Sequence, residues 1–248
     1  MKTGKPGRMA FTLLEMLAVI SIVGFLSMLL VPTLVRSGDK ARRVRCLSNL
    51  RQVGIAFHSF LPDHGDSFPM DVSTNSGGTY EILTASYLAH GDSYLAYAHF
   101  QALSNELANP AVLVCPADRA RAVAGDFSSL GNQNVSYFVG ANADVSLPNS
   151  LLAGDRNILP AGSSARALVR LNADNPAGWT REVHGLKGDQ LFADGHVERV
   201  NGRMVKLPKR NAPIMMDLLL PALKPAPPPP SALASAEARG SRALDWQP

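Results

Sequence analysis

Residues 11–31 read FTLLEMLAVISIVGFLSMLLV, the most apolar segment of the chain. Glu15 is the only charged residue in it. As an α-helix that rises about 1.5 Å per residue, the stretch is roughly 31 Å long, which matches the hydrocarbon thickness of a bilayer. The sequence therefore predicts a transmembrane helix over residues 11–31.

A secretory signal peptide is the competing interpretation, because Lys2, Lys5 and Arg8 precede the apolar run. The run is longer than the roughly 7–15 apolar residues typical of a signal-peptide core, and no small-residue cleavage site follows it. We therefore expect the segment to be retained as an anchor. The bases that follow it, between Arg36 and Arg51, outnumber those before it, and this count alone favours an orientation with the leader outside.

The residues around the start of the run, GRMAFTLLEMLAVISIVG (7–24), resemble the processing site of type IV prepilins and type II secretion pseudopilins. Both have a basic leader, a small residue before the cut (here Ala10), an aromatic new N-terminus (Phe11) and a glutamate four residues further on (Glu15). Ala10 stands where the family nearly always has glycine. The resemblance implies that a prepilin peptidase removes residues 1–10 and methylates Phe11. It also implies that Glu15 pairs with the Phe11 ammonium of a neighbouring subunit and sets the axial register of a filament.

The same resemblance implies a location and a set of partners. The leader would lie in the cytoplasm, the helix would cross the cytoplasmic (inner) membrane once, and the head would lie in the periplasm or on an extracellular filament. The partners would be the peptidase, an assembly ATPase with its platform protein, and other pilin subunits in a homo- or hetero-polymer. The alternatives are a singly membrane-anchored periplasmic binding module that does not polymerise, and a DNA-binding minor pilin.

The amphipathic pattern after the apolar run extends the helix. Beyond Pro32, apolar residues recur at three- or four-residue intervals as far as Leu61, with arginines mostly between them. We expect one long helix from residue 11 to about 61, softened or kinked at Pro32. The predicted divisions are a leader (1–10), a transmembrane helix (11–31), its amphipathic continuation (32–61), a globular head (62–208) and a Pro-rich disordered tail (209–248).

The head has short, patterned segments that indicate an α+β fold. Helical spacing occurs at 80–87 and 94–107, and strand-like runs occur at 111–114, 135–139, 151–153 and 167–171. Residues 214–220 are apolar enough for one short helix or a docking patch, with local packing favoured over a partner site. The economical assembly is the pilin-like one, a long N-terminal helix packed on a small antiparallel β-sheet.

The clearest local pattern in the head is HGLKGDQLFADGHVERV, residues 184–200. Asp194 and Gly195 lie between two alternating runs, which predicts a tight β-hairpin. The spacing from His184 to Asp194-Gly195 also resembles the H-x9-DG C-terminal region of prepilin-type proteins common in Planctomycetes and Verrucomicrobia. CPAD (115–118) and LLAGDRN (151–157) add to this resemblance.

The two cysteines, Cys46 and Cys115, are too few for a disulfide scaffold. They can form one disulfide in an exported protein or remain as buried thiols.

Four residues of the 184–200 segment carry metal-ligand side chains: His184, Asp189, Asp194 and His196. Neighbouring residues of a strand face opposite sides and Asp194 forms the turn, so we predict no metal and no other cofactor. Calcium is the alternative that the sequence leaves open: it would use oxygen ligands such as Asp144, Asp155 or Asp189, although none has calcium-loop spacing.

Neither an enzyme nor a nucleic-acid-binding protein is expected. The net charge is +4 with a pI near 9.2, but the bases cluster on both sides of the apolar run, as around a membrane span. The sequence has no GxSxG, HExxH or phosphate-loop motif. A structural role is therefore favoured.

Overall fold

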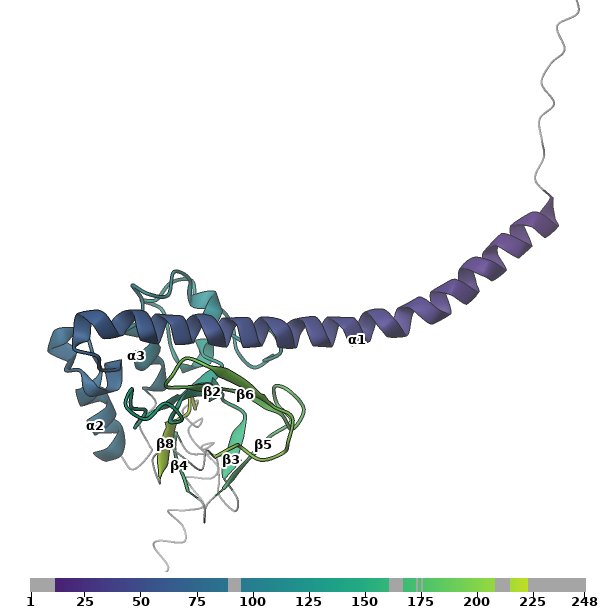
Figure 1. The fold of residues 1–248 in the computed structure, drawn as a ribbon. Helices are drawn as coiled ribbons and strands as arrows, with labels where there is room; N and C mark the ends of the chain where they lie inside the picture. The colour runs from purple at the N-terminus through teal and green to yellow at the C-terminus, as the bar shows by residue number, and fades with distance from the viewer. Residues whose placement is uncertain are drawn as a thin grey trace, which may run out of the picture.

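The computed structural model describes residues 12–88, 95–160, 167–172, 174, 176–207 and 215–222, without the side chains of residues 29–37, 39 and 160. A long helix comes first, short helices and 3₁₀ turns follow, and the strands come last (Figure 1). The helices are α1 (Leu13–Phe60), α2 (Tyr80–Leu88) and α3 (Ala96–Gln101), with 3₁₀ turns η1 (Leu61–His64), η2 (Pro69–Asp71), η3 (Thr74–Ser76), η4 (Pro110–Leu113) and η5 (Asn132–Asn134). The strands are β1 (Tyr137–Gly140), β2 (Leu151–Asp155), β3 (Ile158–Pro160), β4 (Leu168–Leu171), β5 (Ala177–Trp179), β6 (Gly188–Phe192), β7 (Val197–Val200) and β8 (Met216–Leu219).

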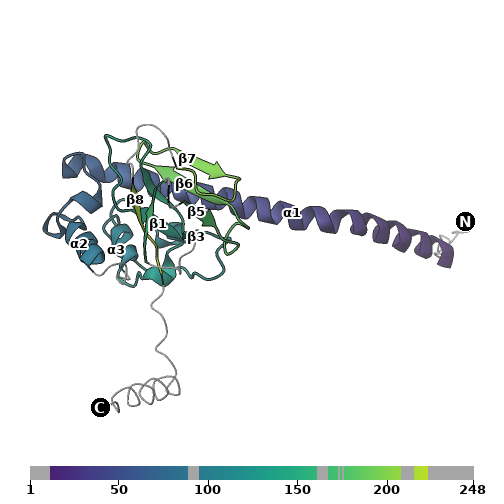
Figure 2. The same cartoon turned by 90° about the horizontal axis from the view of Figure 1, so that it is seen from below.

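The predicted single long helix is confirmed, because α1 runs without a break for 48 residues. It starts with a capping box, in which Thr12 Oγ1 accepts from the Glu15 N–H at 3.3 Å and Glu15 Oε2 accepts from the Thr12 N–H at 2.9 Å. The helix continues through position 32, so Pro32 does not end it. Figures 1 and 2 show α1 leaving the head as a curved rod.

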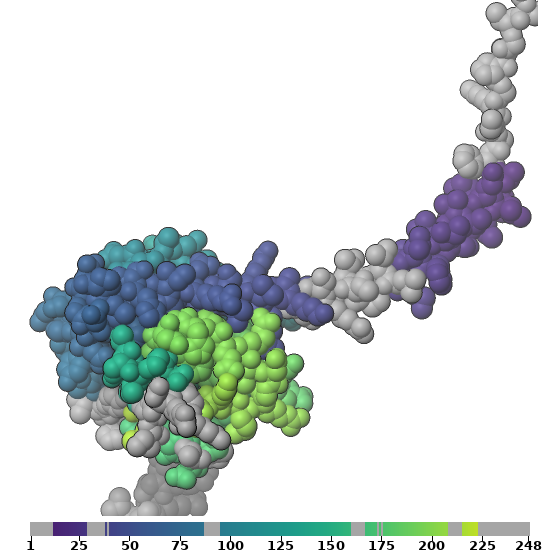
Figure 3. Space-filling model, viewed as in Figure 1, coloured from purple at the N-terminus to yellow at the C-terminus, as the bar shows by residue number. Residues whose placement is uncertain are grey.

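The N-terminal part of α1 stands clear of the head (Figure 3). Its described side chains, residues 12–28, are all exposed, with Leu13 at 83 % and Met28 at 78 %. In the described part of the chain, no helix combines the length and the hydropathy needed to cross a membrane. The predicted span, 11–31, includes Phe11 and side chains beyond Met28 that lie outside the described residues.

The α+β class and the antiparallel sheet are confirmed. Six strands pair in the order β4-β8-β1-β2-β6-β7, every pair antiparallel, and β3 and β5 form a separate two-stranded antiparallel sheet. Successive strand residues point to opposite faces, so Tyr137 belongs to the core under α1 while Phe138 belongs to the core on the opposite face, with Trp179. Gly54 lets α1 approach the sheet closely, because a Cβ there would lie 2.8 Å from Leu191 Cδ1.

Two sequence-based assignments are wrong. Residues 111–114 do not form a strand; most of this run lies in the 3₁₀ turn η4, which begins with Pro110 and is capped by Asn109. The tail does not begin at residue 209, because Met216–Leu219 is strand β8 and pairs with β1 and β4 inside the sheet. The head therefore extends beyond residue 208, and of the predicted tail only 215–222 lies among the described residues.

Candidate functional site

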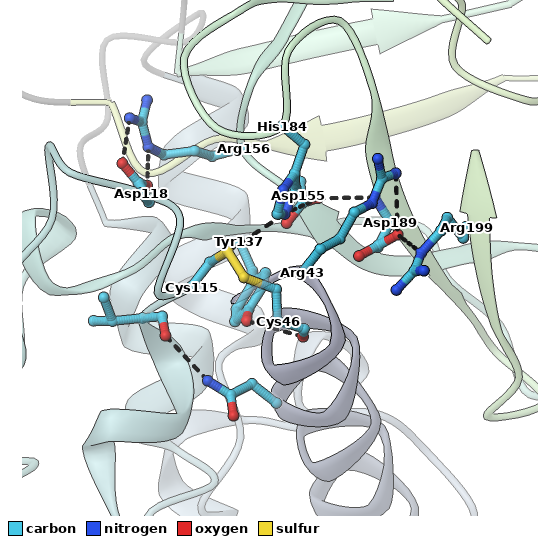
Figure 4. Close-up of a disulfide and its surroundings, with 12 residues drawn as sticks. Arg43, Cys46, Cys115, Asp118, Tyr137, Asp155, Arg156, His184, Asp189 and Arg199 are labelled. Carbon is cyan, nitrogen blue, oxygen red and sulfur yellow. Dashed lines mark hydrogen bonds and ion pairs between the residues drawn. A yellow bond between two sulfur atoms is a disulfide. The ribbon is translucent and has the colours of Figure 1, made fainter. Parts of the chain in front are cut away.

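Three sequence segments that are distant along the chain meet beside α1 (Figure 4). They are the segments quoted for the resemblance: CPAD contributes Cys115 and Asp118, LLAGDRN contributes Asp155 and Arg156, and the H-x9-DG region contributes His184. The buried, polar side chains of this junction are the candidate functional site.

A disulfide joins Cys46 of α1 to Cys115, which follows η4. Their Cα atoms are 4.8 Å apart, and both residues are buried. Two further contacts support the same junction: Asn49 Nδ2 donates to the Val114 carbonyl at 3.1 Å, and Tyr137 Oη donates to the Cys46 carbonyl at 3.4 Å. The pairing that the sequence left open is thus a covalent link between the helix and the head.

His184 lies directly over this bridge. Its Nε2 is 3.4 Å from Cys115 Sγ and 3.5 Å from Asp155 Oδ2, and its side chain is only 4 % exposed. Gly185 and Leu186 both have positive φ and turn the chain immediately after it. Burial, helped by the charges of Arg43 and Arg199, lowers the pKa of His184 to about 4. The imidazole is therefore neutral at neutral pH.

Two aspartates on neighbouring strands share this buried space. Asp155 Oδ2 accepts the backbone N–H of Asp189 at 2.8 Å, while Asp155 Oδ1 has no hydrogen-bond partner among the described residues. Both residues are fully buried. Burial, and next the charge of Asp189, raises the pKa of Asp155 well above its usual range, and burial also raises the pKa of Asp189.

Two arginines neutralise Asp189 without a hydrogen bond. Arg43 Nη2 lies 3.7 Å from Asp189 Oδ1, and Arg199 Nε lies 3.5 Å from the same oxygen. Neither carboxylate oxygen of Asp189 has a hydrogen-bond partner among the described residues. Buried polar atoms are nearly always hydrogen-bonded, so Asp189 has compensation for its charge but lacks the hydrogen bonds expected of a buried carboxylate.

Unlike Asp189, the neighbouring Asp118 is fully hydrogen-bonded to an arginine. Arg156 donates from Nε to Asp118 Oδ2 at 2.7 Å and from Nη2 to Asp118 Oδ1 at 2.9 Å. A further bond joins Arg156 Nη1 to Glu182 at 2.7 Å. Burial by itself would raise the pKa of Asp118, but the hydrogen bonds and the charge of Arg156 lower it below its usual value. This bidentate ion pair holds the CPAD segment against the LLAGDRN segment, which is a structural role.

The structure separates the predicted H-x9-DG residues. Asp194 and Gly195 form the exposed β6–β7 turn, where Gly195 has a φ of +84° and packs near His58 of α1. Asp194 Oδ1 contacts His196 Nδ1 at 2.5 Å, and the His196 ring stacks on Phe192. Asp194 and His196 are therefore not ligands beside His184.

Among the described residues, Asp155, His184 and Asp189 form a group that can hold a metal, because their ligand atoms all lie within 4.8 Å of one another. Sequence reasoning had His184 and Asp189 in one candidate set and Asp155 in another. The signal that could have joined them is an aspartate after glycine in each of two apolar strands, Gly154-Asp155 and Gly188-Asp189. Asp144 lies elsewhere, in a pocket with Asp66 and Asp71.

A basic pocket of about 350 Å³ leads to His184 from outside, lined in part by Lys40, Arg42 and Arg43. Ala10 and Phe11, the predicted cleavage site, lie outside the described residues. Searches of protein-family models, curated proteins and solved structures found no match to the chain. The site therefore has to be interpreted from its own residues.

Proposed function

We propose that the chain is a subunit of a pilin-like filament, of the type IV pilus or type II secretion pseudopilus class. It is anchored by residues 11–31 and cut by a prepilin peptidase between Ala10 and Phe11. The observation that carries this proposal is the division of α1 into two halves. Leu50 and Phe57 in the second half are fully buried in the head, whereas the described side chains of residues 12–28 are all exposed.

The projecting half of α1 is apolar around its whole circumference. The large apolar side chains of residues 13–28 are 50–83 % exposed, and Figure 3 shows them away from the head. An exposed apolar surface of this kind requires lipid or neighbouring helices to cover it. A pilin-like subunit meets both environments in turn. Lipid covers the helix while the subunit is anchored in the membrane, and neighbouring helices cover it once the subunit is in the filament.

Glu15 has two roles that an experiment can separate. In the single chain its carboxylate caps α1 through Thr12. In the filament it pairs, by the proposal, with the Phe11 ammonium of a neighbour. Glutamine can also complete a capping box, so Glu15→Gln removes the charge and keeps the cap. Thr12→Ala keeps the charge of Glu15 and removes the capping side chain, which stabilises the helix by about 1 kcal/mol.

We therefore expect Glu15→Gln and Glu15→Leu to enter the membrane fraction normally and to be absent from sheared filaments. Thr12→Ala should enter both fractions. Quantitative immunoblots of the two fractions measure this. Normal filament incorporation of Glu15→Gln would show that Glu15 is only a helix cap, and would remove the register role.

Processing has its own test. The intact mass of the protein from cells with the peptidase should correspond to loss of residues 1–10 plus one methyl group, and cells without the peptidase should keep the full precursor. Ala10→Gly should be processed faster than the natural chain. An unprocessed chain in peptidase-containing cells would contradict the proposal at its first step.

The charges of the head also support polymerisation. No lysine or arginine occurs in residues 52–118, and a pocket at the end of the head beyond α1 is lined by Asp66, Asp71 and Asp144. Lysine and arginine line the pockets at the root of the projecting helix, roughly 27 Å away along α1. Opposite charges at opposite ends favour head-to-tail contacts, which build open filaments.

The basic root pockets also support one alternative, the DNA-binding minor pilin. One of these pockets adds Arg119 and Arg181 to Arg42. If the pockets contact phosphates, binding of the chain to duplex DNA should weaken steeply between 50 and 200 mM salt. Binding that is absent at low salt would reject this alternative and leave the filament proposal untouched.

A further inference from the structure

The side chain of Asp155 from β2 and those of His184 and Asp189 from the 184–200 segment converge beside the Cys46–Cys115 bridge (Figure 4). We propose that they bind one divalent transition-metal ion, with zinc as the probe. This site does not depend on polymerisation, and it gives a role to the histidine of the H-x9-DG region.

The geometry already approaches a ligand set. His184 Nε2 and Asp155 Oδ2 are 3.5 Å apart, and one ligand atom from each of the three residues lies within 4.8 Å of the others. Zinc–nitrogen and zinc–oxygen bonds of about 2.0–2.2 Å place two tetrahedral ligands roughly 3.3 Å from each other. Small side-chain movements are therefore enough to bring the three atoms onto one ion.

The unsatisfied atoms are the second observation. Asp155 is fully buried, and its Oδ1 has no hydrogen-bond partner among the described residues; the same holds for both oxygens of Asp189. A buried carboxylate without partners costs free energy, and a cation supplies the missing interaction.

The surrounding charges set the strength of binding. Arg43 and Arg199 neutralise Asp189 when no metal is bound, so an ion has to compete with them. Among the described residues, Asp155 accepts one hydrogen bond, from the backbone N–H of Asp189, and His184 Nε2 lies 3.5 Å from its Oδ2. The Arg199 side chain is 34 % exposed and can turn towards solvent, which releases one competitor.

The ligand chemistry selects the class of ion. One imidazole and two carboxylates suit zinc and related first-row metals, whereas calcium takes six to eight oxygen ligands. Cys46 and Cys115 also lie beside His184, but their sulfur atoms are joined to each other and cannot act as thiolates. Three protein ligands leave a fourth position for water.

The test uses the full-length chain in detergent, stripped with a chelator and kept under non-reducing conditions so that the disulfide persists. Zinc is titrated calorimetrically, and bound metal is counted by elemental analysis. We expect one zinc per chain. Loss of a ligand in His184→Gln or Asp155→Asn should weaken binding at least 10- to 100-fold, since loss of a residue that only supports a ligand already costs that much.

Two further variants make the result specific. Arg199→Gln removes a competitor for Asp189 and should tighten binding severalfold, a direction that a purely structural ion-pair network does not produce. His196→Gln, which removes the exposed imidazole of the same hairpin, should bind as the natural chain does. Asp155→Asn keeps an acceptor for the Asp189 N–H, so it serves if His184→Gln fails to fold.

Absence of stoichiometric zinc in the natural chain overturns the proposal, and so does equal weakening in His196→Gln. Weaker binding in Arg199→Gln also overturns it.

Discussion

Replacing both Cys46 and Cys115 with alanine should lower the free energy of unfolding of the head by about 4 kcal/mol. The bridge joins residues 69 positions apart. For a closed loop of this size, the chain-entropy model removes about 15 cal/mol/K from the unfolded state, or about 4 kcal/mol at 25 °C. The fold should persist, because Leu50 and Phe57 of α1 remain packed in the core.

Urea unfolding of the detergent-solubilised chain measures this loss, with Trp179 as the reporter. Trp179 is buried in the core opposite α1, so its fluorescence follows the head. The other tryptophan, Trp246, lies outside the described residues and is replaced with Phe in both proteins. The variant should also have a steeper dependence on urea, because an unfolded chain without the cross-link exposes more surface.

The natural chain with its disulfide reduced is the matched control, since it lacks only the bond and should unfold at the same urea concentration as the double variant. A loss below about 1 kcal/mol, with an unchanged urea dependence, would refute the reasoning. It would mean that packing alone holds α1 on the sheet, and that the unfolded chain is already compact.

Two further predictions follow from single contacts in the head. A Cβ at Gly188 would collide with the ring of Trp179, whereas one at Gly202 would meet nothing within 4 Å; we expect Gly188→Ala to cost about 2 kcal/mol and Gly202→Ala less than about 0.5 kcal/mol, as thermal unfolding midpoints will show. An equal loss of stability in the two variants would contradict the packing of Gly188 against Trp179. Asp118→Asn leaves Arg156 without its buried partner and should cost about 3 kcal/mol at pH 7. The native pKa of Asp118 is below its ordinary value of 3.8, so the stabilisation is complete above that value and is lost as the pH falls through the native pKa. The difference between the natural chain and the variant should therefore shrink below about pH 4, and a constant difference down to pH 2 would rule out this origin.

The parts of the fold that the sequence predicted were those with a long or local signal. For α1 the signal was a continuous apolar run followed by a helical period as far as Leu61. The Asp194-Gly195 turn fixes the β6–β7 hairpin through its own backbone preferences. Short apolar runs carry no such signal. Most of the run 111–114 lies in the 3₁₀ turn η4, because Asn109 caps that turn and Pro110 begins it. Strand β8 shows no alternation because both of its faces are buried.

The candidate site was predicted only in part, for a different reason. His184 stands out through a motif, but its neighbours depend on how strands pair. The antiparallel register of β2 and β6 places Gly154 opposite Gln190, and this brings Asp155 beside Asp189. Strand register between residues so far apart in sequence is a tertiary property, so a list of ligand-type residues from the 184–200 segment could not include Asp155.

The Cys46–Cys115 bridge also determines how the molecule carries load. A pull on the projecting end of α1 passes to the residues after Cys115 through the covalent bond, and residues 47–114 lie in a loop that the bond bypasses. That loop contains the last turns of α1, residues 47–60, together with α2 and α3. Tension along the helix therefore does not need to be borne by the helical part of the head, and the sheet is held by a chemical bond rather than by packing alone.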